Sequence, residues 1–155
     1  MLKWLKRDER GQSLVEVAGV SVFLILLSLM IFETGVMFFS YVALLNASRE
    51  GAMYASAHPE LADPAKTPAD SQAYLTYTER IVKGEVRLGN LVDPTRLTIY
   101  RPVLVNGTSN FGDPIRVRVD YQLVTFTSTI RLPFFGRFGL PNYWPMSVAA
   151  TMPIR

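Results

Sequence analysis

The chain has 155 residues, of which 49% are apolar and 19% are charged, and its net charge is +3. This length fits one small domain and an anchor, and the weak positive charge without a basic block argues against nucleic-acid binding. The absence of cysteine excludes disulfides, thiolate metal ligands and cysteine nucleophiles.

The N-terminal segment is basic and ends in a glycine. Its basic residues are Lys3, Lys6, Arg7 and Arg10. Gly11 is followed five positions later by Glu16, inside sequence that is otherwise apolar. A charge in a membrane span costs about 2.5–3.5 kcal/mol, so Glu16 is a functional candidate. The arrangement resembles a type IV prepilin leader, which predicts cleavage after Gly11 to leave Gln12 as the mature N-terminus.

A membrane-spanning helix is predicted directly after this junction. Only Glu16 and Glu33 interrupt the apolar sequence between residues 14 and 45, and about 20 apolar residues span a bilayer. The excess of basic residues before the span predicts a cytoplasmic N-terminus and an external C-terminal domain.

The predicted helix continues far beyond one membrane thickness. It runs from about Ser13 to Ala57, where His58-Pro59 stops it, because the residue before a proline is pushed out of the helical region. These 45 residues would be about 68 Å long at 1.5 Å per residue. The C-terminal half of the helix must therefore pack on protein outside the bilayer.

Each glutamate has two interpretations. Glu16 is either solvated by lipid headgroups near Arg10, or it pairs with the freed α-amino group at Gln12 of a neighbouring subunit and fixes the register between them. Glu33 is either an interfacial carboxylate or an intersubunit contact, for example to Arg49 of a neighbour. Within one helix Glu33 and Arg49 are too far apart to meet.

Small residues in the span form a possible packing stripe. Their spacings of three, seven and seven keep them near one helix face, and small residues allow close helix approach in lipid. A chance arrangement is the alternative. The residues are Ala18, Ser21, Ser28 and Gly35.

The domain beyond Pro59 is predicted to begin with a loop and a helix. Thr67 is suited to cap that helix and Pro68 to its first position. The helix is expected to end near Leu88, before Gly89. Its buried face is predicted to contain Tyr74, Tyr77, Ile81 and Leu88.

Strands are predicted in the rest of the domain. Residues 97–105 suit one strand, and residues 146–152 suit the last one. Between them, apolar residues alternate with polar ones from Ile115 to Leu123, which predicts a half-buried strand antiparallel to its predecessor. Arg116 and Arg118 share its polar face, either solvated or as a partner-binding patch. The aromatic segment 132–141 either caps the core or forms an exposed apolar loop.

The predicted fold is therefore α+β and pilin-like: a long N-terminal transmembrane helix, then a small domain with one helix and an antiparallel sheet. The expected organisation is a leader (1–11), a membrane and assembly helix (12–57) and an extracytoplasmic domain (58–155). His58 is the single histidine, and the sequence has no phosphate-binding loop and no nucleophile elbow. We expect no enzyme activity, no catalytic residue, no metal and no cofactor.

Three blocks together resemble the TadE-like pseudopilins of the tight-adherence (Flp) pilus system. The first is the leader junction, residues 10–16. The second is Phe32-Glu33-Thr34-Gly35, and the third is residues 46–55, Asn-Ala-Ser-Arg-Glu-Gly-Ala-Met-Tyr-Ala. The blocks lie within about a third of the chain.

This resemblance implies a minor pilin or pseudopilin in the cytoplasmic membrane, processed by a prepilin peptidase and acting in pilus assembly or as a pilus subunit outside the cell. Its implied partners are the membrane, the peptidase and other pilin or pseudopilin subunits. The alternative is an uncleaved single-pass membrane protein that presents a small extracytoplasmic binding domain. The leader pair Gly11 and Glu16 separates the two, because a plain anchor needs neither.

Overall fold

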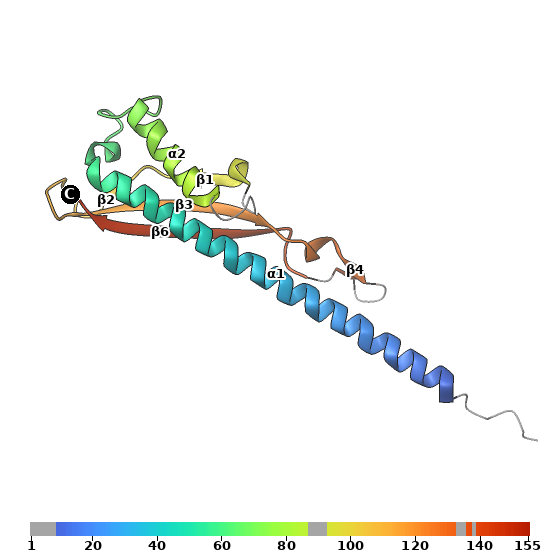
Figure 1. Cartoon of the computed structure of the whole chain (residues 1–155). Coiled ribbons are helices and arrows are strands. Elements are labelled where there is room, and N and C mark those ends of the chain that lie inside the picture. The colour runs from blue at the N-terminus through green and yellow to red at the C-terminus, as the bar shows by residue number, and fades with distance from the viewer. Residues whose placement is uncertain (1–8, 87–92, 133–135, 138) are drawn as a thin grey trace, which may run out of the picture.

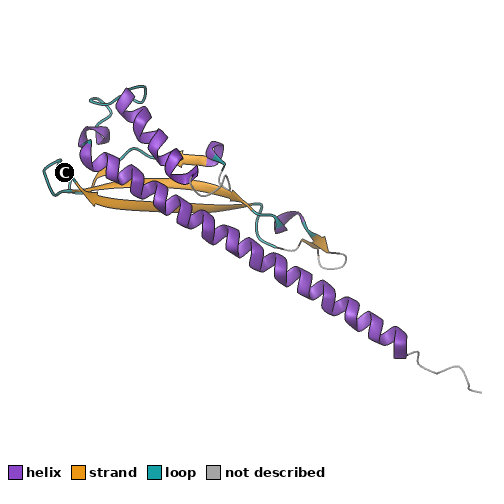
Figure 2. Cartoon of the chain, viewed as in Figure 1, coloured by secondary structure: helices purple, strands orange, loops and turns teal. Residues whose placement is uncertain are grey.

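One long helix carries a small α+β domain along its C-terminal half (Figure 1). This computed structural model describes residues 9–86, 93–132, 136–137 and 139–155. Figure 2 shows the two α-helices beside a twisted sheet, with the N-terminal half of the long helix projecting away from the domain. The elements are α1 (Glu9–Ala57), η1 (Pro59–Ala62), α2 (Gln72–Val86), η2 (Pro94–Arg96), β1 (Leu97–Ile99), β2 (Val103–Leu104), β3 (Pro114–Val124), η3 (Thr127–Thr129), β4 (Arg131–Leu132), β5 (Gly136–Arg137) and β6 (Tyr143–Pro153).

The long helix α1 ends at Ala57, as predicted from His58-Pro59. It begins at Glu9, four residues before the predicted start, so Gly11 lies in its first turn. A single glycine costs a helix only about 1 kcal/mol relative to alanine, which does not stop a long helix from continuing.

The central strand of the main sheet is β3. The last strand, β6, pairs antiparallel with β3 along its whole length, from Pro114 opposite Pro153 to Val124 opposite Tyr143. The other edge of β3 pairs first with β2 and then with β1, also antiparallel. The predicted antiparallel sheet and the α+β class are confirmed, and the predicted last strand is present as β6.

The single strand predicted over 97–105 is wrong in one respect, because it is divided into β1 and β2. Between them, Arg101 reaches away from the sheet and donates to the carbonyl oxygens of Leu61 (3.0 Å) and Thr67 (2.7 Å). Pro102 has no N–H to give to a strand ladder. Arg101 thus ties the interruption to the segment that follows α1, and Pro102 keeps the strand from continuing through it.

The predicted cap of the second helix is also wrong, because α2 begins at Gln72. Ser71 accepts a hydrogen bond from the N–H of Tyr74 (3.3 Å), which is the cap geometry expected of a serine. Thr67 is buried, and its hydroxyl donates to the carbonyl of Glu60 (2.8 Å) instead. The predicted end at Leu88–Gly89 lies outside the described residues.

The core lies between α1, α2 and the inner face of β3 and β6. The predicted alternation of β3 is confirmed, and Tyr77 and Ile81 of α2 are buried as predicted. A Cβ at Gly51 of α1 would lie 2.7 Å from the side chain of Ile81, so this glycine permits the close approach of α1 and α2. The buried face of α1 beyond Glu33 is rich in small residues: Ser40, Ala43, Leu44, Ala47, Ser48, Ala52, Ala55 and Ser56.

Candidate functional site: the junction between the free helix and the domain

The N-terminal half of α1, residues 11–32, extends past the main sheet, with η3 and β4 beside the part of it nearest the domain (Figure 1). Its large apolar side chains are exposed, among them Leu14, Val15, Phe23 and Ile31. At 1.5 Å per residue these 22 residues are about 33 Å long, which matches the roughly 30 Å hydrocarbon core of a bilayer. Among the described helices, α1 is the one that is long and apolar enough to cross a membrane. We call residues 11–32 the free half of α1 and residues 33–57 its packed half.

Most of the predicted assembly residues lie in the free half. Exposed residues of this group are Glu16, Ala18, Ser21 and Ser28, and Gly11 is exposed as well. Gln12 belongs to the first turns of the same helix. The hydroxyls of Ser21 and Ser28 donate to the carbonyls of Val17 and Leu24, at 2.8 Å each. These bonds satisfy the hydroxyl protons within the helix, so the two serines are compatible with lipid.

Glu33 marks the point where the free half ends and the packed half begins. Its side chain is only 2% exposed. The backbone N–H of Thr127 donates to one carboxylate oxygen (3.3 Å), and the Thr127 hydroxyl donates to the other. Thr127 starts η3, in the connection between β3 and β6, 94 positions away in the sequence. We call this contact the Glu33–Thr127 latch.

The connection around Thr127 is built to hold this residue in place. The N–H of Leu140 donates to the Thr127 hydroxyl oxygen (3.3 Å). Gly139 has φ +110°, and a Cβ there would lie 2.8 Å from the backbone carbonyl carbon of Thr127. Only a glycine fits this position, because both the backbone conformation and the close approach exclude a side chain. The Thr127 hydroxyl therefore donates to the Glu33 carboxylate and accepts from the backbone N–H of Leu140. It thus links Glu33 to the segment that leads into β6.

The Glu33–Thr127 latch bears on the predicted contact between Glu33 of one chain and Arg49 of a neighbouring chain. Arg49 is exposed on α1. The Glu33 carboxylate is enclosed within its own chain, so a contact with Arg49 of a neighbour would require the latch to open. The sequence contained one signal for the burial of Glu33: it lies seven residues before Ser40, on the stripe of small residues that faces the domain. Gly35, by contrast, is exposed, and a Cβ there would meet nothing within 4 Å.

The outer face of the sheet carries the arginines that were predicted for the polar side of β3. Arg118 forms a two-pronged pair with Asp120, with two N···O distances of 2.8 Å, and its guanidinium lies 5.1 Å from the centre of the Tyr100 ring. The hydrogen bond from Arg118 holds the pKa of the Asp120 carboxyl below its usual range. Arg118 is thus occupied within the chain, whereas Arg116 makes one long contact, of 3.5 Å, to Thr151.

The described residues contain no group of three or more His, Asp or Glu side chains placed to hold a metal ion. Burial raises the pKa of Tyr77, whose hydroxyl donates to the carbonyl of Tyr100 (2.8 Å). This tyrosine is thus a core residue with a satisfied hydroxyl.

The fold and the junction indicate a membrane-anchored α+β protein, because one helix among the described residues is long and apolar enough to cross a membrane and also carries the domain on its packed half. Residues 11–53 match the model of a family described as TadE-like protein. The matched segment begins at Gly11 and covers the free half of α1 and most of the packed half, so the predicted resemblance is confirmed there. No curated protein and no solved structure gives a significant match. The match supports an association of this membrane protein with the Tad pilus system.

Proposed function

We propose that this protein is a minor pilin or pseudopilin that is cut after Gly11 by a prepilin peptidase and then acts in the assembly, or as a subunit, of a Tad/Flp-type pilus. In this proposal the chain is inserted in the cytoplasmic membrane with its N-terminus inside. The domain beyond residue 57 lies outside the cytoplasm, and it leaves the membrane with the pilus if the chain joins the filament. Its partners are the peptidase and other pilin or pseudopilin subunits.

The observation that carries this proposal is that the fold gives no reason for a glycine at position 11. A Cβ at Gly11 would meet nothing within 4 Å, and its φ is not positive. Glycine in a helix costs about 1 kcal/mol relative to alanine. A residue that the folded chain does not require, at the start of the family match, is best explained by an external requirement, which a peptidase that accepts only a small residue would provide.

Glu16 supplies the second part of the proposal. It lies on the exposed free half, five positions after the proposed cleavage site. In a filament, the free halves leave lipid and must be covered by neighbouring subunits. The Glu16 carboxylate would then pair with the α-amino group of Gln12 in the next subunit, a head-to-tail contact of the kind that builds open filaments. Close helix packing would use the small residues Ala18, Ser21, Ser28 and Gly35. Arg49 is a further candidate for an intersubunit contact, and Glu33 would join it only where the Glu33–Thr127 latch opens.

An uncleaved, single-pass membrane protein that presents its domain for binding is the second candidate. The shallow depression of about 260 Å³ on the outer face of the sheet, between Arg96, Tyr100 and Arg118, favours such a presenting role. This presenting role requires neither cleavage of the chain nor the residues Gly11 and Glu16.

Leader processing is tested by the intact mass of the protein extracted from membranes of cells with and without the cognate peptidase. We expect a species that begins at Gln12 only when the peptidase is present. Gly11→Leu is expected to abolish this species. Gly19→Leu is the matched control, because a Cβ at Gly19 also meets nothing within 4 Å, and this variant should be processed normally.

The possible outcomes separate the two candidate functions. Retention of residues 1–11 in cells with the complete system would overturn the pseudopilin proposal and leave the anchored binding protein. A mature species that has lost ammonia would reveal a cyclised glutamine. Cleavage would then be established, but the amine assigned to pair with Glu16 would be absent, and that part of the proposal would fail.

A further inference from the structure

The end of the domain next to the free half of α1 carries exposed aromatic side chains. Phe126 is 61% exposed and Trp144 38% exposed, and both lie close to the points where β3 ends and β6 begins. Trp144 also lines an open, largely apolar groove of about 410 Å³ together with Phe38 and Tyr41 of α1. We call Phe38, Tyr41, Phe126 and Trp144 the aromatic rim.

The aromatic rim is continuous with the apolar surface of the free half. The ring of Phe126 lies 6.3 Å from the ring of Phe32, the last residue of that half. One residue further along each segment, the Glu33–Thr127 latch fixes the connection against α1. The rim therefore begins at the level where the helix would leave the hydrocarbon core.

We propose that the aromatic rim rests in the headgroup region of the outer leaflet of the same membrane that α1 crosses. Tryptophan and tyrosine are enriched at this level, because an apolar ring with a polar edge suits an interface between hydrocarbon and water. The headgroup layer is about 5–7 Å thick on each side of the core. Residues 34–41, which include Phe38 and Tyr41 of the rim, rise about 11 Å along the axis of α1. The part of the rim nearest Phe32 therefore falls within this layer, and Tyr41 lies toward its outer edge.

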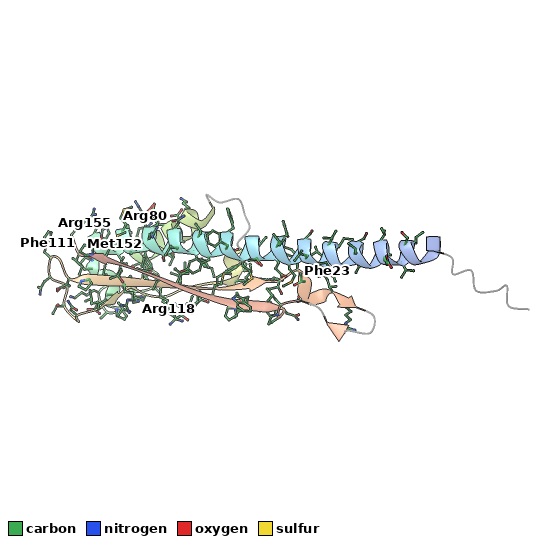
Figure 3. The ribbon with its side chains drawn as sticks, turned by 90° about the horizontal axis from the view of Figure 1, so that it is seen from below. Phe23, Arg80, Phe111, Arg118, Met152 and Arg155 are labelled. Atoms are coloured by element: carbon green, nitrogen blue, oxygen red, sulfur yellow. The ribbon has the colours of Figure 1, made fainter. Side chains whose placement is uncertain are left out.

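A comparison of the aromatic rim with Phe111 supports the lipid bilayer as the surface that the rim contacts. Phe111 is more exposed than any residue of the rim, at 88%. Figure 3 places it at the opposite end of the domain, near Arg155 and far from Phe23 of the free half. Phe111 is therefore remote from the apolar surface of the free half, whereas the aromatic rim continues that surface. A second copy could also cover the rim, but only where copies assemble, whereas a chain anchored by α1 always has lipid at this level.

The inference concerns the anchored chain before any assembly. It holds for the processed and the unprocessed chain alike, because both contain α1 and the domain, so the outcome of the mass measurement does not decide it.

Tryptophan fluorescence of the full chain in vesicles tests the proposal. Trp4→Phe leaves Trp144 as the one tryptophan. The vesicles contain phosphatidylcholine and phosphatidylglycerol, with or without a nitroxide attached to the lipid headgroup, and iodide is present on both sides as the aqueous quencher. The matched control chain carries Trp4→Phe, Trp144→Phe and Phe111→Trp, which moves the reporter to the opposite end of the domain.

We expect the headgroup nitroxide to quench Trp144 about threefold more strongly than it quenches tryptophan at position 111. Iodide should show the reverse order. A third chain, with Trp4→Phe, Trp144→Phe and Phe126→Trp, should behave like the Trp144 chain, and it guards against an effect peculiar to one position.

Two results would overturn the proposal. Equal quenching of the reporters at 144 and 111 by both agents would show that the rim faces water. Protection of Trp144 from both quenchers, lost when the protein is diluted into excess lipid, would show that a second copy covers the rim.

Discussion

The free and packed halves of α1 have similar backbones and opposite environments. Large apolar residues surround the free half on all sides, which suits lipid. In the packed half, small residues gather on one stripe, and the sheet and α2 approach along it. Hydrophobicity alone does not separate the two halves, because both are apolar. The two halves differ in that small side chains line the buried face of the packed half, whereas large exposed side chains dominate the free half.

The two glutamates show the same difference. Glu16 lies on the exposed half, and Glu33 is enclosed by the chain's own β3–β6 connection. Glu33 therefore helps to fix how the domain sits on the helix, whereas Glu16 lies on the exposed surface of the free half.

The largest effect is expected from a bulky residue at Gly51, on the buried face of the packed half. Gly51→Leu should lower the free energy of unfolding by about 3 kcal/mol or more, because a Cβ already meets Ile81 at 2.7 Å and overpacking commonly costs about 1–3 kcal/mol. Denaturation of the full chain in detergent micelles, followed by Trp144 fluorescence in a Trp4→Phe background, measures it.

Gly35→Leu is the matched variant for the exposed surface of α1. Its Cβ meets nothing within 4 Å, so we expect the domain to be as stable as the original or slightly more stable, since leucine favours a helix. A large loss of stability in Gly35→Leu, or none in Gly51→Leu, would contradict the assignment of Gly35 to the exposed face of α1 and of Gly51 to its buried face.

Removal of the latch carboxylate is expected to have the next largest effect. Glu33→Ala leaves the N–H and the hydroxyl of Thr127 without their acceptors in a buried setting, which should cost about 1–3 kcal/mol of unfolding free energy. The same denaturation assay measures it. Combining Glu33→Ala with Thr127→Val should cost less than the sum of the two single changes, because the two residues share one interaction.

Glu16→Ala is the counterpart in the free half. It should leave the unfolding free energy of the domain unchanged and permit leader cleavage, but impair pilus assembly. Normal piliation with Glu16→Ala would contradict its role in setting the register, and a destabilised domain would contradict the separation of the two glutamates.

The smallest effect concerns the outer face of the sheet. The pKa of Asp120 is lowered in the folded chain by its bond to Arg118, so the pair stabilises the fold above the unfolded pKa of about 3.9. This contribution is lost as the pH falls through the folded pKa. Asp120→Asn should therefore be less stable than the original chain near neutral pH, and the difference should vanish in strong acid. A difference that persists or grows in acid would show that the pair contributes no charge-dependent stability.

Much of the fold was predictable because its signals are local. The alternation from Ile115 to Leu123 and the proline after His58 determine β3 and the end of α1 without reference to distant residues. The predictions that were wrong involve distant partners. Arg101 divides the predicted strand by reaching Leu61 and Thr67, and Thr67 is bonded to Glu60 instead of capping α2.

The sequence by itself determined the long apolar helix, the α+β class and the leader-like pair of Gly11 and Glu16, because length, periodicity and spacing are properties of neighbouring residues. Only the tertiary structure decided the environment of Glu33 and the position of the aromatic rim. Thr127 is 94 positions from Glu33 in the sequence, and a pattern of neighbouring residues carries no information about a contact over that separation. The latch and the rim exist because the β3–β6 pairing returns the chain to α1 at one level of the helix.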